Sequence, residues 1–209
     1  MSSYGILKSA TNTGSDADIL IKFSTPLTVN SNQPAFVSDS MSLRRVVSSM
    51  PVQRWEIEAA LYPSNDSADY LVHSVQNGYT NRVYIRMPQV YRPASMKTPV
   101  VPLTTSGALL QGATTLNIAG LSGGQNMAKG EFISFGSFSK VYLVTIPGSV
   151  GSGVGIFPPL VDDIPSGTTV NIGDSVTLRA YYDTNVQLGI RYSDGVLSDP
   201  GTVRFIEAL

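Results

Sequence analysis

The segment Gly120–Gly124 reads Gly-Leu-Ser-Gly-Gly and matches the G-x-S-x-G pattern that presents a nucleophilic serine, here Ser122, in hydrolases. That chemistry needs a helix after the serine and a histidine further along the chain to accept its proton. The residues that follow, QNMAKGEF, are too few between their glycines for such a helix, and the only histidine, His73, precedes the serine. We therefore predict that Ser122 lies in a hairpin loop and is not a nucleophile.

Two acidic pairs, Asp16/Asp18 and Asp162-Asp163, contain the carboxylates that calcium sites use. Neither pair has EF-hand spacing or a convergent partner, so we interpret them as acids of turns or strand ends. His73 cannot build a multi-histidine metal site by itself, and we expect it on the solvated face of a helix. The chain has no cysteine, which excludes disulfides, thiol nucleophiles and cysteine-based zinc sites. We predict no catalytic, cofactor-binding or metal-binding residues.

The glycine-rich segment Gly151–Gly155 is similar to a phosphate-binding loop only in its glycine content. A phosphate loop leads into a helix whose N-terminus faces the anion, whereas Pro158-Pro159 follows here. The segment therefore predicts a flexible turn.

Arginines give the first half of the chain a mild basic bias, and Tyr84 and Tyr91 lie between some of them; they are Arg44, Arg45, Arg54, Arg82, Arg86 and Arg92. Interleaved cations and aromatic rings can stack single-stranded nucleic acid on a small barrel. The segment in which we expect such a barrel carries only Lys129 and Lys140, however. Arginine and tyrosine are also enriched in protein interfaces, and we favour that interpretation.

The composition is low in charge. Of 209 residues, 42% are hydrophobic and only 14% are charged, against about a quarter in ordinary globular domains. The net charge of −1 attracts neither nucleic acid nor an anionic membrane. The start of the chain, MSSYGILKSATNTG, shows no signal peptide, and no apolar run is long enough to cross a bilayer. We expect protein partners and neither membrane nor nucleic-acid binding.

Period-2 alternation of apolar and polar residues dominates the chain, which is typical of antiparallel strands with one buried face. It is clearest in residues 19–23, 53–61, 82–87 and 175–183. One segment differs, because Ala68, Leu71, Val72 and Val75 form an apolar stripe at helical spacing before Gly78. We therefore predict one helix at about 65–77.

The pattern changes between residues 98 and 173. Prolines at 88, 93, 99 and 102 suggest a linker, and five short strand-like segments follow at 113–121, 131–135, 140–145, 153–157 and 168–172. Closely spaced short strands favour a small closed barrel, since closure removes exposed edges. We predict a mainly β fold in which a β-sandwich or split-sheet domain with one helix, residues 1–97 and 174–209, is interrupted by a barrel at 98–173.

Aromatic residues in the barrel segment allow two interpretations; they are Phe135, Phe138, Tyr142 and Phe157. They either present stacking faces to a carbohydrate or fill the barrel core. Trp55, on the apolar face of its strand, is expected to anchor the core of the other domain.

Several segments resemble the distal tail proteins of long-tailed, non-contractile bacteriophages. These are GEFISFGSFSKVYLVT (130–145), GVGIFPPLVDDIPSGTTVNI (153–172), SVTLRAYYD (175–183), QRWEIEAALYPSNDSADYLVHSVQ (53–76) and TVRFIEAL (202–209). Lys140-Val141-Tyr142 and Pro159-Leu160 match the family pattern, and Gly130-Glu131 stands where Gly-Asp is usual. Residues 1–50 match least well.

The resemblance implies that the barrel is of the oligonucleotide/oligosaccharide-binding (OB) type. It further implies a virion protein, assembled in the host cytoplasm, that forms a ring at the tail tip, with a hexamer as the expected form. The ring is expected to connect the tail tube protein to the baseplate hub and, through it, to receptor-binding or fibre proteins. It implies neither an enzyme nor a cofactor. The alternative is a carbohydrate-binding module or accessory adhesin that uses the barrel.

Overall fold

The computed structural model of the chain describes residues 6–8, 21–39, 45–49, 52–61, 82–88, 102–121, 126–148, 152–185, 191–193, 197–199 and 201–209. Within this part of the chain the fold is mainly β and consists of several antiparallel sheets, as the alternation predicted. The one described helical element is a single 3-10 turn at Gly173–Ser175. The helix predicted at 65–77 lies outside the described residues.

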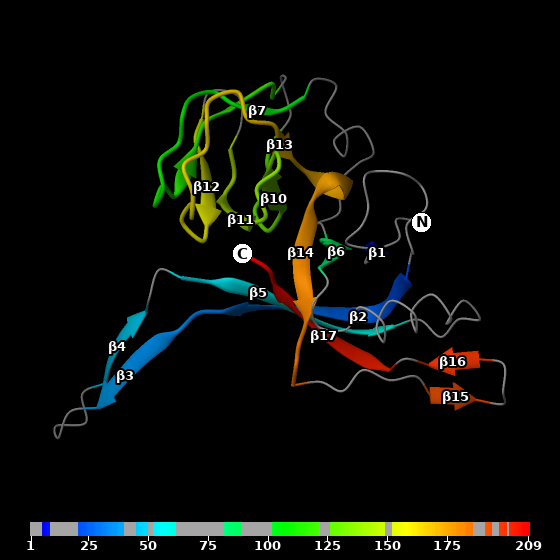
Figure 1. The fold of residues 1–209 in the computed structure, drawn as a ribbon. Coiled ribbons are helices and arrows are strands. Elements are labelled where there is room, and N and C mark those ends of the chain that lie inside the picture. Colours follow the sequence, from blue (N-terminus) through cyan, green and yellow to red (C-terminus); the bar gives the residue numbers. More distant parts are fainter. Residues whose placement is uncertain are drawn as a thin grey trace.

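Strands from the beginning, middle and end of the chain form the largest sheet, which we call the main sheet. It contains β1 (Ile6–Lys8), β2 (Ile21–Asn32), β5 (Arg54–Leu61), β17 (Thr202–Glu207), β14 (Thr177–Tyr182) and β6 (Val83–Arg86) in that order. All the pairings are antiparallel, and β1 pairs with both β2 and β6, so the order returns to its start. Figure 1 shows β5, β17 and β2 crossing below β14 and β6.

The predicted inner faces of the main sheet are buried. On β5 the inner residues are Trp55, Ile57, Ala59 and Leu61, and β6, β14 and β17 add Val83, Ile85, Leu178, Ala180, Tyr182, Val203 and Phe205. Phe205 lies at the centre, with ring centroids 5.8 Å from Phe23 and 4.9 Å from Tyr182. The sandwich-like packing therefore follows from the period of two that a pleated strand imposes.

The segment between residues 102 and 172, which we call the inserted unit, has sheets of its own. Its strands are β7 (Thr104–Thr105), β8 (Thr115–Leu116), β9 (Ile118–Ala119), β10 (Phe132–Phe135), β11 (Val141–Ile146), β12 (Val154–Phe157) and β13 (Val170–Asn171). Five of them form a sheet in the order β13-β10-β11-β12-β8, and β7 pairs with β9. Among the described residues these strands pair only with one another, so Lys129 to Gly148 and Trp55 belong to different sheets.

The small closed barrel predicted for the inserted unit is not one closed sheet, because the chain changes strand partners at Asn117. Thr115 and Leu116 pair with β12, whereas Ile118 and Ala119 pair with β7. The chain thus changes partner after two residues, and the wall of the unit is divided between two sheets. Thr104 forms a bridge with Thr169, and backbone hydrogen bonds from Thr105 to Thr168 at 2.9 Å and from Val170 to Leu103 at 2.8 Å also link β7 to the start of β13.

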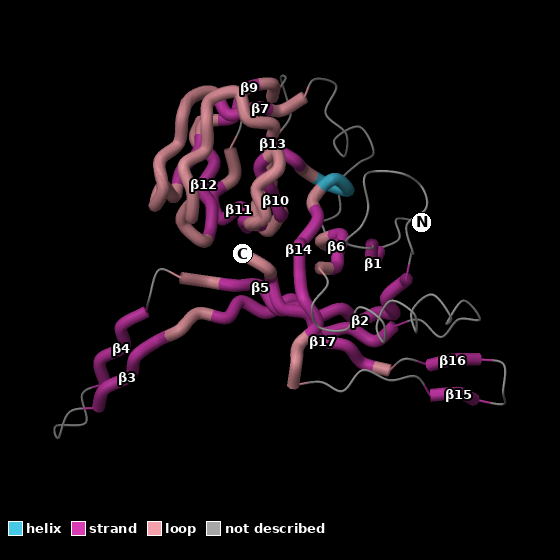
Figure 2. The backbone as a smooth tube through the Cα atoms, in the orientation of Figure 1, coloured by secondary structure: helices cyan, strands magenta, loops and turns pink. Residues whose placement is uncertain are grey.

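Alternate residues of β10 and β11 serve two cores. Phe132 and Val141 belong to the core of the main sheet, and Leu143 packs against it. Ile133, Phe135, Tyr142 and Val144 belong to the core of the inserted unit. The five-stranded sheet is therefore covered on both faces, which explains why all four residues of β10 are buried. Figure 2 shows the inserted unit lying directly over the main sheet.

Two hairpins extend from the main sheet (Figures 1 and 2). One contains β3 (Ala35–Asp39) and β4 (Arg45–Ser49), which pair with each other beyond the outer ends of β2 and β5. We call this hairpin the arm. The other contains β15 (Arg191–Ser193) and β16 (Leu197–Asp199).

Candidate functional site

Several residues that the sequence marked for possible chemistry lie outside the described part of the chain. These are Ser122, His73, Asp16, Asp18, Arg44, Tyr91 and Arg92. Asp162 and Asp163 are described and exposed, and Asp163 Oδ1 accepts a hydrogen bond of 2.7 Å from the backbone N–H of Gln111. Both acids therefore lie in a loop, in agreement with their predicted position in a turn. Within the described residues, no three side chains of metal-ligating type gather into a possible metal site.

Trp55 is a core anchor, as predicted. Only 4% of the residue is exposed, and its indole N–H donates a 2.8 Å hydrogen bond to the carbonyl of Val141 in the inserted unit. Its ring meets Phe132 edge to face, with centroids 5.4 Å apart and planes at 89°. The residue therefore joins the two sheets rather than presenting a platform to a ligand.

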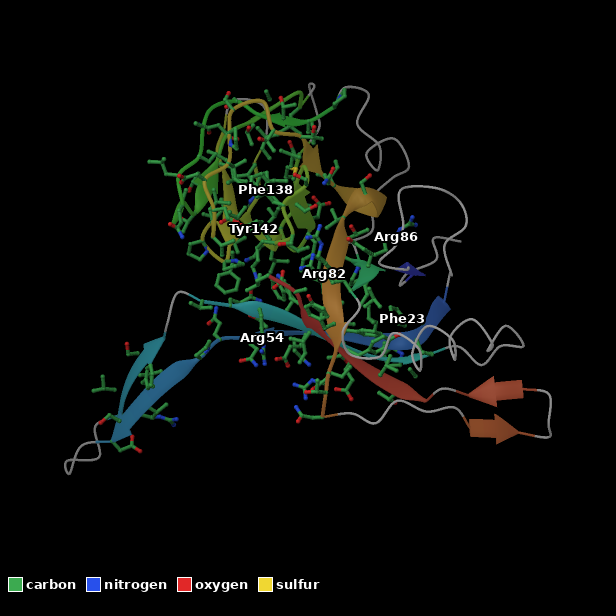
Figure 3. All side chains as sticks on the ribbon, viewed as in Figure 1. Phe23, Arg54, Arg82, Arg86, Phe138 and Tyr142 are labelled. Atoms are coloured by element: carbon green, nitrogen blue, oxygen red, sulfur yellow. The ribbon has the colours of Figure 1, made fainter. Side chains whose placement is uncertain are left out.

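The aromatic residues of the inserted unit present little stacking surface. Phe135 and Tyr142 are buried against each other, with ring centroids 5.5 Å apart. The Tyr142 hydroxyl accepts a 3.3 Å hydrogen bond from the N–H of Val161, and burial raises the pKa of that hydroxyl to about 12. Phe138 and Phe157 are partly buried against the two cores (Figure 3 labels Phe138 and Tyr142). Core filling is thus the interpretation that the geometry of Phe135 and Tyr142 supports.

A buried ion pair joins the inserted unit to the main sheet. Lys140, just before β11, meets Glu207 at the end of β17, and their side chains are 2% and 0% exposed. The ammonium of Lys140 also donates to the backbone carbonyl of Gln53 at 2.7 Å and to the side-chain carbonyl of Gln53 at 2.9 Å. All three ammonium protons thus have an acceptor, which a buried cation requires.

The carboxylate of Glu207 also holds the backbone of both sheets. Its Oε2 accepts the N–H of Trp55 at 2.9 Å, and its Oε1 accepts the N–H of Val141 at 3.3 Å. Burial raises the pKa of Glu207 and lowers the pKa of Lys140, because each charge is removed from water. The cost of removing both charges from water opposes the attraction between them. The pair therefore contributes more to the specificity of the contact between the two units than to its stability.

Sequence reasoning did not identify this pair. One signal for Glu207 was available, since the alternation of β17 places Glu207 on the same face as the buried Val203 and Phe205. A carboxylate on an apolar face calls for a buried partner. Nothing local distinguishes Lys140, which lies in a polar stretch between β10 and β11.

The outer face of the main sheet carries a polar network around Glu56, whose side chain is 4% exposed. Asn32 donates to its carboxylate at 2.7 Å, Arg54 at 3.0 Å, and Arg204 forms a further ion pair. Arg204 also lies 3.4 Å from Asp183. Burial tends to raise the pKa of Glu56, but the hydrogen bonds from Asn32 and Arg204 and the charge of Arg204 lower it overall.

Arginine and tyrosine pair across β6 and β14 on that outer face. Arg82 donates to the hydroxyl of Tyr181 at 3.0 Å, and its guanidinium lies 5.9 Å from the centre of that ring. The guanidinium of Arg179 lies 5.6 Å from the ring centre of Tyr84. Arg86 is half-buried opposite Thr177. Figure 3 marks Arg54, Arg82 and Arg86 among the side chains of the sheet.

The arm presents apolar side chains to solvent. Phe36 is 64% exposed, and Val37, Val46 and Val47 are each about half exposed. Neither outer edge of the arm pairs with another described strand. Open edges and exposed apolar residues are features that proteins usually avoid unless a partner covers them.

Comparison with protein-family models and with curated proteins identifies no relative of the chain. No protein-family model matches it, and no curated protein has significant similarity to it. Among the described residues, the structure contains no helix with the length and apolar character to cross a membrane.

Proposed function

We propose that this chain is a structural protein that assembles with copies of itself into a ring at the tip of a bacteriophage tail. In this role it connects the tail tube to the baseplate hub and to receptor-binding or fibre proteins, and it catalyses no reaction. The ring assembles in the host cytoplasm before it becomes part of the virion.

The arm is the observation that carries the proposal. An isolated two-stranded hairpin is marginally stable in water, and this one adds exposed valines and a phenylalanine to that weakness. A hairpin of this kind is expected to persist when a neighbouring subunit covers it. A standard interface buries about 800 Å² on each partner, which an arm and the adjoining edge of a body can supply together.

Two further features support a mechanical role. Lys140, Glu207 and Trp55 hold the inserted unit on the main sheet through buried contacts, so a load on one unit is passed to the other. The resemblance of residues 130–183 to the distal tail family comes from the sequence and is independent of the arm. The alternative of a carbohydrate-binding module gains nothing from Phe135 and Tyr142, because both are buried.

Self-assembly can be tested directly. The purified full chain should sediment as a species larger than a monomer and form rings in negative-stain electron micrographs. Phe36→Asp and Val47→Asp place charges on the two faces of the arm and should each shift the protein towards the monomer. Ile146→Asp is the matched control, since Ile146 is 61% exposed but lies on β11 of the inserted unit, outside the arm. A wild-type chain that stays monomeric at high concentration would refute the proposal.

A further inference from the structure

The arm is separated from the body by an interruption in the ladder. The last pair on the body side is Asn32 with Arg54, and the first pair in the arm is Ala35 with Ser49. The intervening segments contain Pro34 on one side and Pro51 on the other. Proline lacks the N–H that a ladder bond requires, so the pairing lapses at this point. Figure 1 shows the arm directed away from the inserted unit of its own chain.

Both faces of the arm are apolar. Val37 pairs with Val47 on one face, while Phe36 and Val46 lie on the other face opposite Ser48 and Ser38. The only described charges in the arm are Asp39 and Arg45, which are opposite each other at its outer end. The arm therefore needs a partner surface that is apolar, carries few charges, and has a carboxylate where Arg45 arrives.

The inserted unit of the same chain offers such a surface. Residues 98–128 contain no charged side chain, and within them Leu110 is 71% exposed. The neighbouring Leu109 pairs with Ile164, and Gln111 donates its N–H to Asp163 Oδ1 at 2.7 Å. The exposed acids Asp162 and Asp163 therefore flank Leu110. We call these two acids, together with Leu110 and Gln111, the Leu110 patch.

We propose that the arm of one copy packs on the Leu110 patch of a neighbouring copy, a contact that rests on the proposed self-assembly. Val37 and Val47 cover Leu110, and Arg45, which lies on the same face of the arm, faces Asp162. The contact is heterologous, because each copy donates an arm at one site and accepts one at another. Heterologous contacts form a ring when the rotation between copies closes and an open filament when it does not, and the proposed ring is the closed case. Apolar burial supplies the attraction, and the charge pair fixes how the arm is placed.

The arm supplies ten strand residues, whereas a standard interface uses about 20–30 on each side. The arm and patch therefore form the centre of a larger contact, to which the adjoining body surfaces contribute. A charge placed at this centre should weaken the whole association, since interface energy is concentrated in a few buried positions.

The test compares two exposed apolar residues of the inserted unit. Leu110→Asp should weaken self-association of the full chain at least about tenfold in sedimentation velocity. Ile146→Asp is the matched control, since Ile146 is 61% exposed but lies on β11 outside the patch, and it should assemble like wild type. Thermal melting of both variants establishes that each is folded.

A charge exchange tests the pairing of the arm with the patch. Arg45→Glu and Asp162→Arg should each weaken assembly, and the double variant should recover most of the loss. Arg45→Glu also sets like charges opposite each other in the arm, so recovery in the double variant is the informative result. Assembly of Leu110→Asp at wild-type strength, or no recovery in the double variant, would overturn this contact while leaving the ring intact. A monomeric wild-type chain would overturn the ring as well.

Discussion

Lys140 and Glu207 form a buried ion pair across the boundary between two sheets, although they are 67 positions apart in the chain. The same carboxylate accepts N–H groups from Trp55 in the main sheet and from Val141 in the inserted unit. One side chain thus fixes the distance between two backbones. This arrangement makes the junction specific, because no displaced packing of the two units can satisfy all of these groups together.

Removing the lysine should be costly. Lys140→Met leaves the carboxylate of Glu207 buried without its counter-charge, and we expect a loss of about 3–5 kcal/mol in the free energy of unfolding. Urea denaturation followed by the fluorescence of Trp55, the only tryptophan, measures this loss at the junction itself. Lys129→Met is the control, because Lys129 is exposed, and it should change stability by less than about 0.5 kcal/mol. A loss below about 1 kcal/mol in Lys140→Met would show that the pair does not hold the junction.

The stability of Lys140→Met should depend on pH. Burial raises the pKa of Glu207 above its ordinary value of 4.5, and loss of the lysine raises it further. A raised carboxyl pKa contributes stability that is complete below the unfolded value and is lost as pH rises through the folded value. The deficit of Lys140→Met relative to wild type should therefore shrink as pH is lowered from 7 towards 4.5.

The double variant Lys140→Met/Glu207→Gln identifies the group responsible, since it contains no carboxyl at this position. Its unfolding free energy should lack the rise on acidification that the single variant shows. An equal pH dependence in the two variants would assign the effect to another group.

Tyr142 should behave as a core residue. Tyr142→Ala removes a buried ring that packs on Phe135, and we expect a loss of about 3–5 kcal/mol in stability. Tyr142→Phe removes only the acceptor for the N–H of Val161 and should cost about 1–3 kcal/mol. Thermal or urea unfolding of the two variants distinguishes these losses. A folded Tyr142→Ala protein that had lost binding on a glycan array would instead favour the carbohydrate-binding alternative.

Glu56 should contribute to stability in the opposite pH direction. The pKa of this carboxyl is lowered overall, so its contribution is present above its unfolded value of 4.5 and is lost as pH falls through the folded value. Glu56→Gln should therefore be less stable than wild type at pH 7, and the difference should disappear in acid. Unfolding free energies measured between pH 7 and pH 3 test this prediction. Glu58→Gln is the matched control on the same strand, because Glu58 is exposed.

The alternation along single strands predicted which residues of the main sheet are buried. Trp55, Ile57, Ala59 and Leu61 all face the core as expected. The outer face departs from the pattern at Glu56, which is buried beneath Asn32, Arg54 and Arg204. Two of those three partners come from other strands, so the burial of Glu56 depends on strand order and cannot be recognised within β5.

The change of partner at Asn117 and the exposure of the arm were also beyond local prediction. Short strands such as Thr115–Leu116 and Ile118–Ala119 contain no information about which neighbour each will select. The valines of β3 and β4 have the same strand preference as buried ones, and only the position of the arm beyond the main sheet leaves them exposed.

The amino-acid sequence by itself therefore determined the β character of the chain and the inner faces of its longer strands, because the period of a pleated strand is a property of the backbone. Only the tertiary structure decided the junction of Lys140 with Glu207, the division of the inserted unit into two sheets, and the exposure of the arm. Each of these depends on which distant segments meet, and that choice is made by the packing of the whole chain rather than by any single segment.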